Sequence, residues 1–174
     1  AQRVYETLGS NTKIIILLRD PVARAISHYH HERRLGTETL DIKSAFDAER
    51  SRLASQIPWP GLNLDRLSNR FCFSYRGRSA YEGQIAPWID LFGRDRIYIA
   101  KSEDFFTYPT KLVDEIIKFL GLNKEPLPQL PKKNEGIYAT GTPSSLLRSL
   151  ESEFSNERTW IEANCNFRLA GETK

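Results

Sequence analysis

The most constraining feature of the sequence is Lys13–Leu18 (KIIILL), an unbroken run of β-branched and aliphatic residues. Such a run predicts a strand buried on both faces, as in a parallel sheet covered by helices. Asp20 and Pro21 follow; the first suits the N-cap of a helix and the second its first turn. We therefore expect a strand, a turn and then a helix over Val22–Leu35 that ends at Gly36.

The rest of the chain alternates helical patterns with one further strand. Ser79 is expected to cap a helix that runs to Phe92, in which Pro87 predicts a kink or a late start. Irregular segments are expected at residues 56–78 and 122–141. The other predicted elements are a helix from Asp41, a strand over Arg96–Lys101, a helix over Pro109–Leu120, and helices that start at Thr142-Pro143 and Asn156. This order predicts an α/β fold with a parallel sheet flanked by helices.

Composition limits the class of protein. A chain of 174 residues that are 40% hydrophobic suits one globular domain over residues 1–174. Mean hydropathy is −0.49, and the longest apolar run is strand-sized, so we expect no membrane span within this chain. The missing secretory signal and the few cysteines favour a cytoplasmic location, or a lumenal or anchored one if an N-terminal segment is missing. The net charge of +3 fits an anionic ligand, but the charges are too interspersed for a nucleic-acid binder.

The chain is interpreted as a C-terminal portion of a domain. It has no methionine, and two predicted strands would leave a sheet with exposed edges. The two cysteines, Cys72 and Cys165, lack metal-type spacing and are expected to be buried or free thiols; the alternative is a disulfide.

Arg19 stands where the first predicted strand ends and its helix begins. Ligands of open α/β sheets bind beyond the carboxyl ends of the strands, and a guanidinium offers a fork of donors that matches phosphate. The following helix adds its free N–H groups, and Ser27 could supply a hydroxyl to the same phosphate. The alternative is that Arg19 forms a structural ion pair and that Ser27 is ordinary helix surface.

The segment Lys13–Tyr29 (KIIILLRDPVARAISHY) resembles the 3′-phosphate-binding motif of sulfotransferases that use the donor PAPS. That pattern is an aliphatic strand, then Arg-(Asp/Asn)-Pro, then a helix that carries Arg-Ala and a Ser. The resemblance implies a P-loop-NTPase-like sheet, incomplete here at its N-terminus. It also implies that Arg19 and Ser27 bind the 3′-phosphate, with Arg24 in the same motif.

Later segments also resemble this family. They are a helix with an Arg-x-x-Tyr start (Arg78, Tyr81), a strand ending in Glu-Asp (Glu103, Asp104) and a Phe-Leu-Gly-Leu helix end. The resemblance implies a nucleotide contact for Tyr81, whose alternative is a core position. It also implies a loop over the nucleotide to which Lys132, Lys133 and Gly136 would belong; the alternative is a solvated loop.

Three histidines, His28, His30 and His31, follow Ser27 closely. Side chains so close along a helix point in different directions and cannot form one metal site, and we expect no metal to be required. In heparan-type members a histidine four residues after the motif Ser lies near the acceptor, and His31 has that place here. Its alternative is helix surface, the position also expected for Glu32.

The family's phosphate loop, of the Lys-x-Gly-Thr type, is absent from these residues. We interpret it, with the main catalytic base, as lying outside the chain. The expected reaction is transfer of a sulfuryl group from PAPS to a hydroxyl or amine of a small-molecule or carbohydrate acceptor, which releases PAP, although this fragment alone could be inactive. The alternatives are a non-catalytic PAP-binding or structural homologue and, third, a small-molecule kinase.

Overall fold

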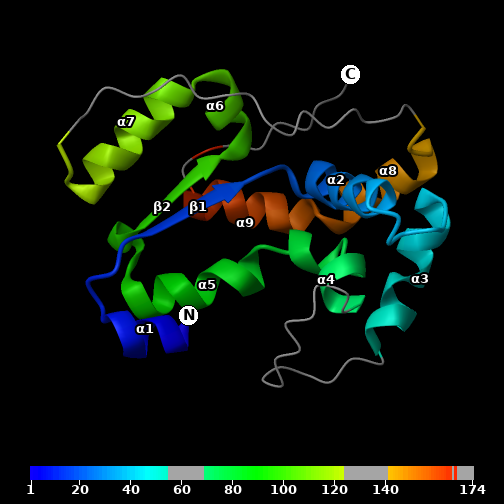
Figure 1. The fold of residues 1–174 in the computed structure, drawn as a ribbon, viewed down its shortest axis with the longest axis horizontal. Coiled ribbons are helices and arrows are strands. Elements are labelled where there is room, and N and C mark those ends of the chain that lie inside the picture. Colours follow the sequence, from blue (N-terminus) through cyan, green and yellow to red (C-terminus); the bar gives the residue numbers. More distant parts are fainter. Residues whose placement is uncertain (55–68, 124–140, 166, 168–174) are drawn as a thin grey trace. The chain divides into compact units, whose positions relative to one another are not determined.

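The computed structural model describes residues 1–54, 69–123, 141–165 and 167 (Figure 1). The chain divides into two compact units. The first comprises Ala1–Asp20, Tyr81–Glu135 and Arg158–Lys174, and the second comprises Pro21–Ala80 and Gly136–Glu157. The single domain expected over residues 1–174 stays a prediction.

The first unit is built on a parallel pair of strands, β1 (Ile14–Leu18) and β2 (Ile97–Lys101). Figure 1 shows them side by side. Their register pairs Ile14 with Ile97 and Leu18 with Lys101, so both strands end at the same edge. Both predicted strands and their parallel pairing are confirmed. The expected burial of the first strand on both faces is wrong, because Ile15 and Leu17 are 40% and 45% exposed on one face of β1. Within the described residues the sheet has two strands, and the predicted α/β class is confirmed as a mainly helical fold with a small parallel sheet.

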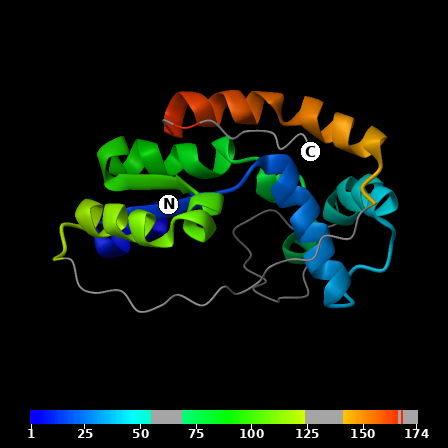
Figure 2. The ribbon, with the colours of Figure 1, turned by 90° about the horizontal axis from the view of Figure 1, so that it is seen from above.

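One face of this sheet carries the core of the first unit. The helices α5 (Glu82–Phe92) and α9 (Ser155–Cys165) pack there, and Figure 2 shows both on the same side of the strands. Alternate strand residues point into this core because side chains of a strand alternate between faces. The buried members are Leu18, Tyr81, Ile85, Ile97, Ile99, Ile161 and Cys165.

The other face of the sheet meets α7 (Pro109–Leu120), which follows α6 (Ser102–Thr107). The Tyr98 hydroxyl donates to Glu115 Oε2 (2.7 Å), and the Tyr98 ring lies 5.5 Å from that of Phe119. Gly121 ends α7 with φ 74°, a left-handed conformation that glycine adopts without strain. Prediction of this helix is confirmed at both ends, whereas α6 and the N-terminal α1 (Gln2–Leu8) were not predicted.

The second unit is helical, with α2 (Pro21–Arg34), α3 (Ile42–Ala54), α4 (Asn69–Phe73) and α8 (Ser144–Glu153). Its core joins α2, α3 and α8 around Phe46, Tyr75 and Leu150. The expectation of an irregular segment over residues 56–78 is wrong for its described part. That part forms α4 and a 3-10 turn, η1 (Gly77–Ser79), because Cys72 and Tyr75 bury their side chains.

The expected start of α5 is also corrected. Ser79 does not cap this helix, which begins three residues later at Glu82, in keeping with the late start that Pro87 predicts. The Ser79 hydroxyl is fully buried and donates to the Tyr75 carbonyl oxygen at 2.9 Å. The Ser79 side chain therefore stabilises the 3-10 turn of the second unit.

Candidate functional site

Arg19 is the first residue after β1, and its backbone and side chain are held by two other elements of the first unit. The Tyr81 hydroxyl, just before α5, donates to the Arg19 carbonyl oxygen at 3.1 Å. The Arg19 Nε atom is buried and lies 3.4 Å from Glu103 Oε1 in the first turn of α6. This pairing follows from the register, since Leu18 is opposite Lys101 and the residues after both strands meet at one edge.

Part of the Arg19 side chain is exposed to solvent. The Arg19 side chain is 33% exposed although its Nε atom is buried, so the exposure comes from its other atoms. A guanidinium carries five N–H donors in a fixed fork, and an interaction through Nε commits only one edge of it. The contact with Glu103 agrees with the alternative interpretation, in which Arg19 forms a structural ion pair. This ion pair does not exclude a contact between Arg19 and an anion.

The next residue, Asp20, is fixed by the last helix. Arg158, in the first turn of α9, donates from Nε to Asp20 Oδ2 at 2.8 Å, and its Nη2 atom lies 2.7 Å from the same oxygen. Both side chains are mostly buried. Sequence reasoning missed this contact because 138 positions separate the two residues and neither belongs to a shared local pattern.

In the second unit, α2 presents Arg24 and Ser27 on neighbouring turns of one helix face, as their spacing of three residues requires. Both side chains are half-buried. Arg24 Nη1 donates to Ser79 Oγ at 3.5 Å. The guanidinium of Arg78 lies 5.1 Å from the Phe71 ring centroid, stacked as a cation over an aromatic face.

The pKa of His28 reflects the charges around it in the second unit. Burial, followed by the charges of Arg24 and Arg78, lowers the pKa of His28 to about 3, so its imidazole is neutral at neutral pH. The two guanidinium groups that disfavour the imidazolium produce a positive potential that favours an anion. Glu32, expected at the surface, is instead buried with its Oε1 atom 3.7 Å from His28 Nε2.

The other predicted site residues have different outcomes. His31 is exposed on α2, and its contact with an acceptor stays a prediction. Lys132, Lys133 and Gly136 lie outside the described residues. Arg19 and Tyr81 belong to the first unit, whereas Arg24 and Ser27 belong to the second. A joint phosphate site for Arg19 and Ser27 therefore stays a prediction, although each half has donors suited to it.

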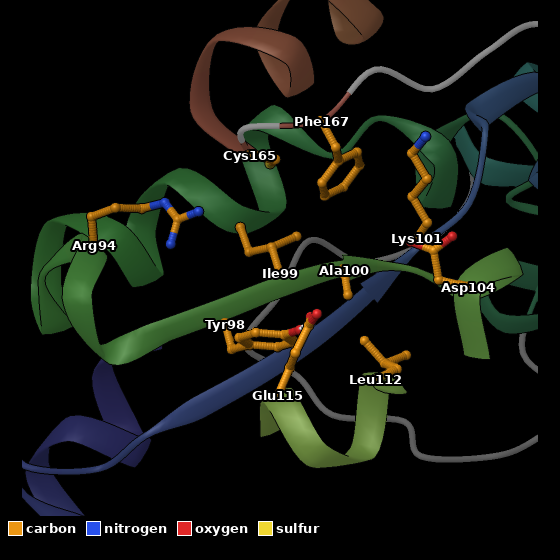
Figure 3. Close-up of a pocket in the computed structure, with 10 residues that line it drawn as sticks. All are labelled: Arg94, Tyr98, Ile99, Ala100, Lys101, Asp104, Leu112, Glu115, Cys165 and Phe167. Carbon is orange, nitrogen blue, oxygen red and sulfur yellow. Dashed lines mark hydrogen bonds between the residues drawn. The ribbon is translucent and has the colours of Figure 1, made fainter. Parts of the chain in front are cut away.

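The first unit also holds a pocket of about 320 Å³ beside β2, which Figure 3 shows in close-up. Two carboxylates, Asp104 and Glu115, line it, but Glu115 already accepts the Tyr98 hydroxyl. Arg94 is also committed, through Nε to the Asn164 carbonyl oxygen at 3.0 Å. Of the predicted site residues that the structure describes, none lines this pocket. The lining residues are Arg94, Tyr98, Ile99, Ala100, Lys101, Asp104, Leu112, Glu115, Cys165 and Phe167.

Among the described residues, no group of three or more His, Cys, Asp or Glu side chains could hold a metal ion. None of the helices in the described part of the chain is long and apolar enough to span a bilayer. Cys72 and Cys165 are both free and buried, as expected.

Comparison with known proteins agrees with this geometry. Residues 4–134 match the family profile of the sulfotransferase domain. The crystal structure of a sulfotransferase from Alicyclobacillus acidocaldarius matches with a TM-score of 0.76 and 26% sequence identity. That match covers 95% of this chain and 58% of the other, so this chain spans under two thirds of the solved protein. A search of curated proteins found no match. Because the family profile matches most of the chain, the chain belongs to the sulfotransferase domain family.

Proposed function

We propose that the protein carrying this chain transfers a sulfuryl group from PAPS to a hydroxyl or amine and releases PAP. The observation that carries the proposal is Arg19, in an Arg-Asp-Pro motif at the carboxyl edge of a parallel sheet, in a chain of the sulfotransferase domain family. The acceptor would be a small molecule or a carbohydrate.

The described residues of the first unit suit the 3′-phosphate of such a donor. Arg19 offers a guanidinium on a side chain that is 33% exposed at the carboxyl edge of the sheet. A phosphate dianion suits this group because hydrogen bonds between charged partners are stronger than neutral ones. Arg24 and Ser27, on α2 of the second unit, stay predicted nucleotide contacts. The role of all three residues in the reaction is to bind and orient the nucleotide, so that the acceptor atom attacks sulfur in line as the bond to the departing phosphate breaks.

A non-catalytic PAP-binding protein is the second candidate. These 174 residues, which cover 58% of the solved sulfotransferase, do not include a Lys-x-Gly-Thr loop for the 5′-phosphosulfate. Such a loop stabilises charge on the leaving group, and binding through the 3′-phosphate alone does not supply that stabilisation. The two candidates share the Arg19 site and differ in turnover.

Calorimetry with PAP tests the site. Arg19→Ala removes a charged phosphate donor, and we expect it to weaken PAP binding by roughly tenfold or more, in line with about 1.5–3 kcal/mol for a charged hydrogen bond. Arg96→Ala is the matched control, since Arg96 is an arginine of the first unit that contacts Asn11 near the opposite ends of the strands. Equal PAP binding by wild type and Arg19→Ala would contradict the assignment.

Turnover separates the two candidates. Wild-type protein is incubated with PAPS and a panel of hydroxyl and amine acceptors, and release of PAP is measured by chromatography. Acceptor-dependent release supports the transferase. Tight PAP binding without release from any acceptor supports the binding protein.

A further inference from the structure

Arg158 holds a residue of the sulfotransferase motif although it lies outside the part of the chain that matches the family profile. The match ends at residue 134, whereas Arg158 lies in the first turn of α9 (Ser155–Cys165). Its Nε and Nη2 atoms both contact Asp20 Oδ2, at 2.8 and 2.7 Å. The family pattern itself therefore does not explain what this arginine does.

The contact is firmer than an ordinary surface ion pair. The Asp20 side chain is 14% exposed and that of Arg158 is 23% exposed, so water screens the pair only partly. Further along α9, Ile161 and Cys165 are buried against the sheet, which fixes the helix from which Arg158 extends. Loss of Arg158 would remove a positive charge from beside this partly buried carboxylate.

Asp20 is the peptide neighbour of Arg19, so its carboxylate matters to any anion bound there. The turn at Arg19 is held from three helical elements: Tyr81 on its carbonyl oxygen, Glu103 at its Nε atom, and Arg158 through Asp20. Without Arg158, the Asp20 carboxylate would repel a bound phosphate and compete for the Arg19 guanidinium. Both effects weaken anion binding.

We propose that Arg158 is a positioning residue for the 3′-phosphate of the nucleotide, acting through Asp20 on Arg19. This inference rests on the proposed function. It makes α9, a segment beyond the family match, part of what determines nucleotide affinity.

The test is a double-mutant cycle read by calorimetry with two nucleotides, PAP and adenosine 5′-phosphate, which lacks the 3′-phosphate. We expect Arg158→Ala to weaken PAP binding roughly tenfold and to leave adenosine 5′-phosphate binding unchanged within about twofold. In the Asp20→Asn background, the same change should weaken PAP binding by less than about threefold, because there is no carboxylate left to neutralise. Arg96→Ala is again the matched control.

Each other outcome overturns the inference. An equal effect of Arg158→Ala in both backgrounds would mean that Arg158 contacts the phosphate directly or acts elsewhere. A parallel loss for both nucleotides would mean a general structural role. Should Arg158→Ala fail to fold, Arg158→Gln replaces it, and thermal unfolding is followed for every variant.

The inference and the proposed function fail in different ways. If wild type binds PAP and Arg19→Ala does not, but Arg158→Ala binds like wild type, the role of Arg158 is refuted and the proposed function stands. If wild type does not bind PAP, the proposed function is refuted, and the role of Arg158 is refuted with it.

Discussion

Glu38→Gln is predicted to destabilise the second unit in a way that depends on pH. Glu38 is 1% exposed, and its carboxylate accepts hydrogen bonds from both terminal nitrogens of Arg52, from the Tyr75 hydroxyl at 2.6 Å and from the Leu40 backbone N–H at 2.9 Å. Burial by itself would raise the pKa of this carboxyl. The bonds from Arg52, Tyr75 and Leu40 outweigh burial and lower the pKa of Glu38 from 4.5 to about 2.

The size of the effect follows from this pKa difference. A fall from 4.5 to about 2 corresponds to roughly 3 kcal/mol of stability, at about 1.4 kcal/mol for each pH unit. Because the folded-state pKa is below the unfolded value, this stability is fully present above about pH 4.5. It is lost as the pH falls from about 4.5 towards 2. Glutamine keeps an acceptor oxygen, so we expect Glu38→Gln to cost roughly 2–3 kcal/mol at pH 7.

Urea unfolding at pH 7, 4.5, 3.5 and 2.5, followed by circular dichroism, measures the difference between wild type and Glu38→Gln. The difference should shrink as the pH falls below 4.5. Asp47→Asn is the matched control, because Asp47 pairs with Lys43 on the exposed face of α3, the helix that carries Arg52. It should change stability little at any pH. A Glu38→Gln difference that stays constant from pH 7 to 2.5 would refute the reasoning.

Three further predictions concern buried groups. Arg76→Met should destabilise by roughly 3 kcal/mol in urea, because it leaves the buried Glu49 carboxylate without its 3.3 Å partner. The free energy of unfolding of the wild type should fall by roughly 2 kcal/mol between pH 6.5 and 5. The reason is that His28 takes up a proton in the unfolded state but not in the folded state, where its pKa is about 3. His28→Gln should lack this loss of stability. Burial raises the pKa of the Cys165 thiol, so a thiol reagent should modify it only slowly before unfolding.

Local sequence signals predicted the fold where they agreed with burial. The run Lys13–Leu18 predicted the strand β1, although Ile15 and Leu17 are exposed on one of its faces, and Pro109 with Gly121 marked both ends of α7. The signals failed where long-range burial decides the structure. Serine is a common helix cap, but the Ser79 hydroxyl is fully buried and donates a hydrogen bond to the Tyr75 carbonyl oxygen. Glutamate usually lies on the exposed face of a helix, but Glu32 is buried beside His28.

The same distinction between local signals and long-range packing holds for the candidate site. Arg19 could be located from the sequence because a strand, a turn and a helix place it by local rules alone. Its partners could not. Glu103 meets Arg19 because two strands share one register, and Arg158 meets Asp20 because α9 packs on the sheet core. Both facts depend on how segments far apart in the chain pack. The motif therefore identifies Arg19 as the candidate phosphate ligand, and the packing decides how much of its side chain is exposed.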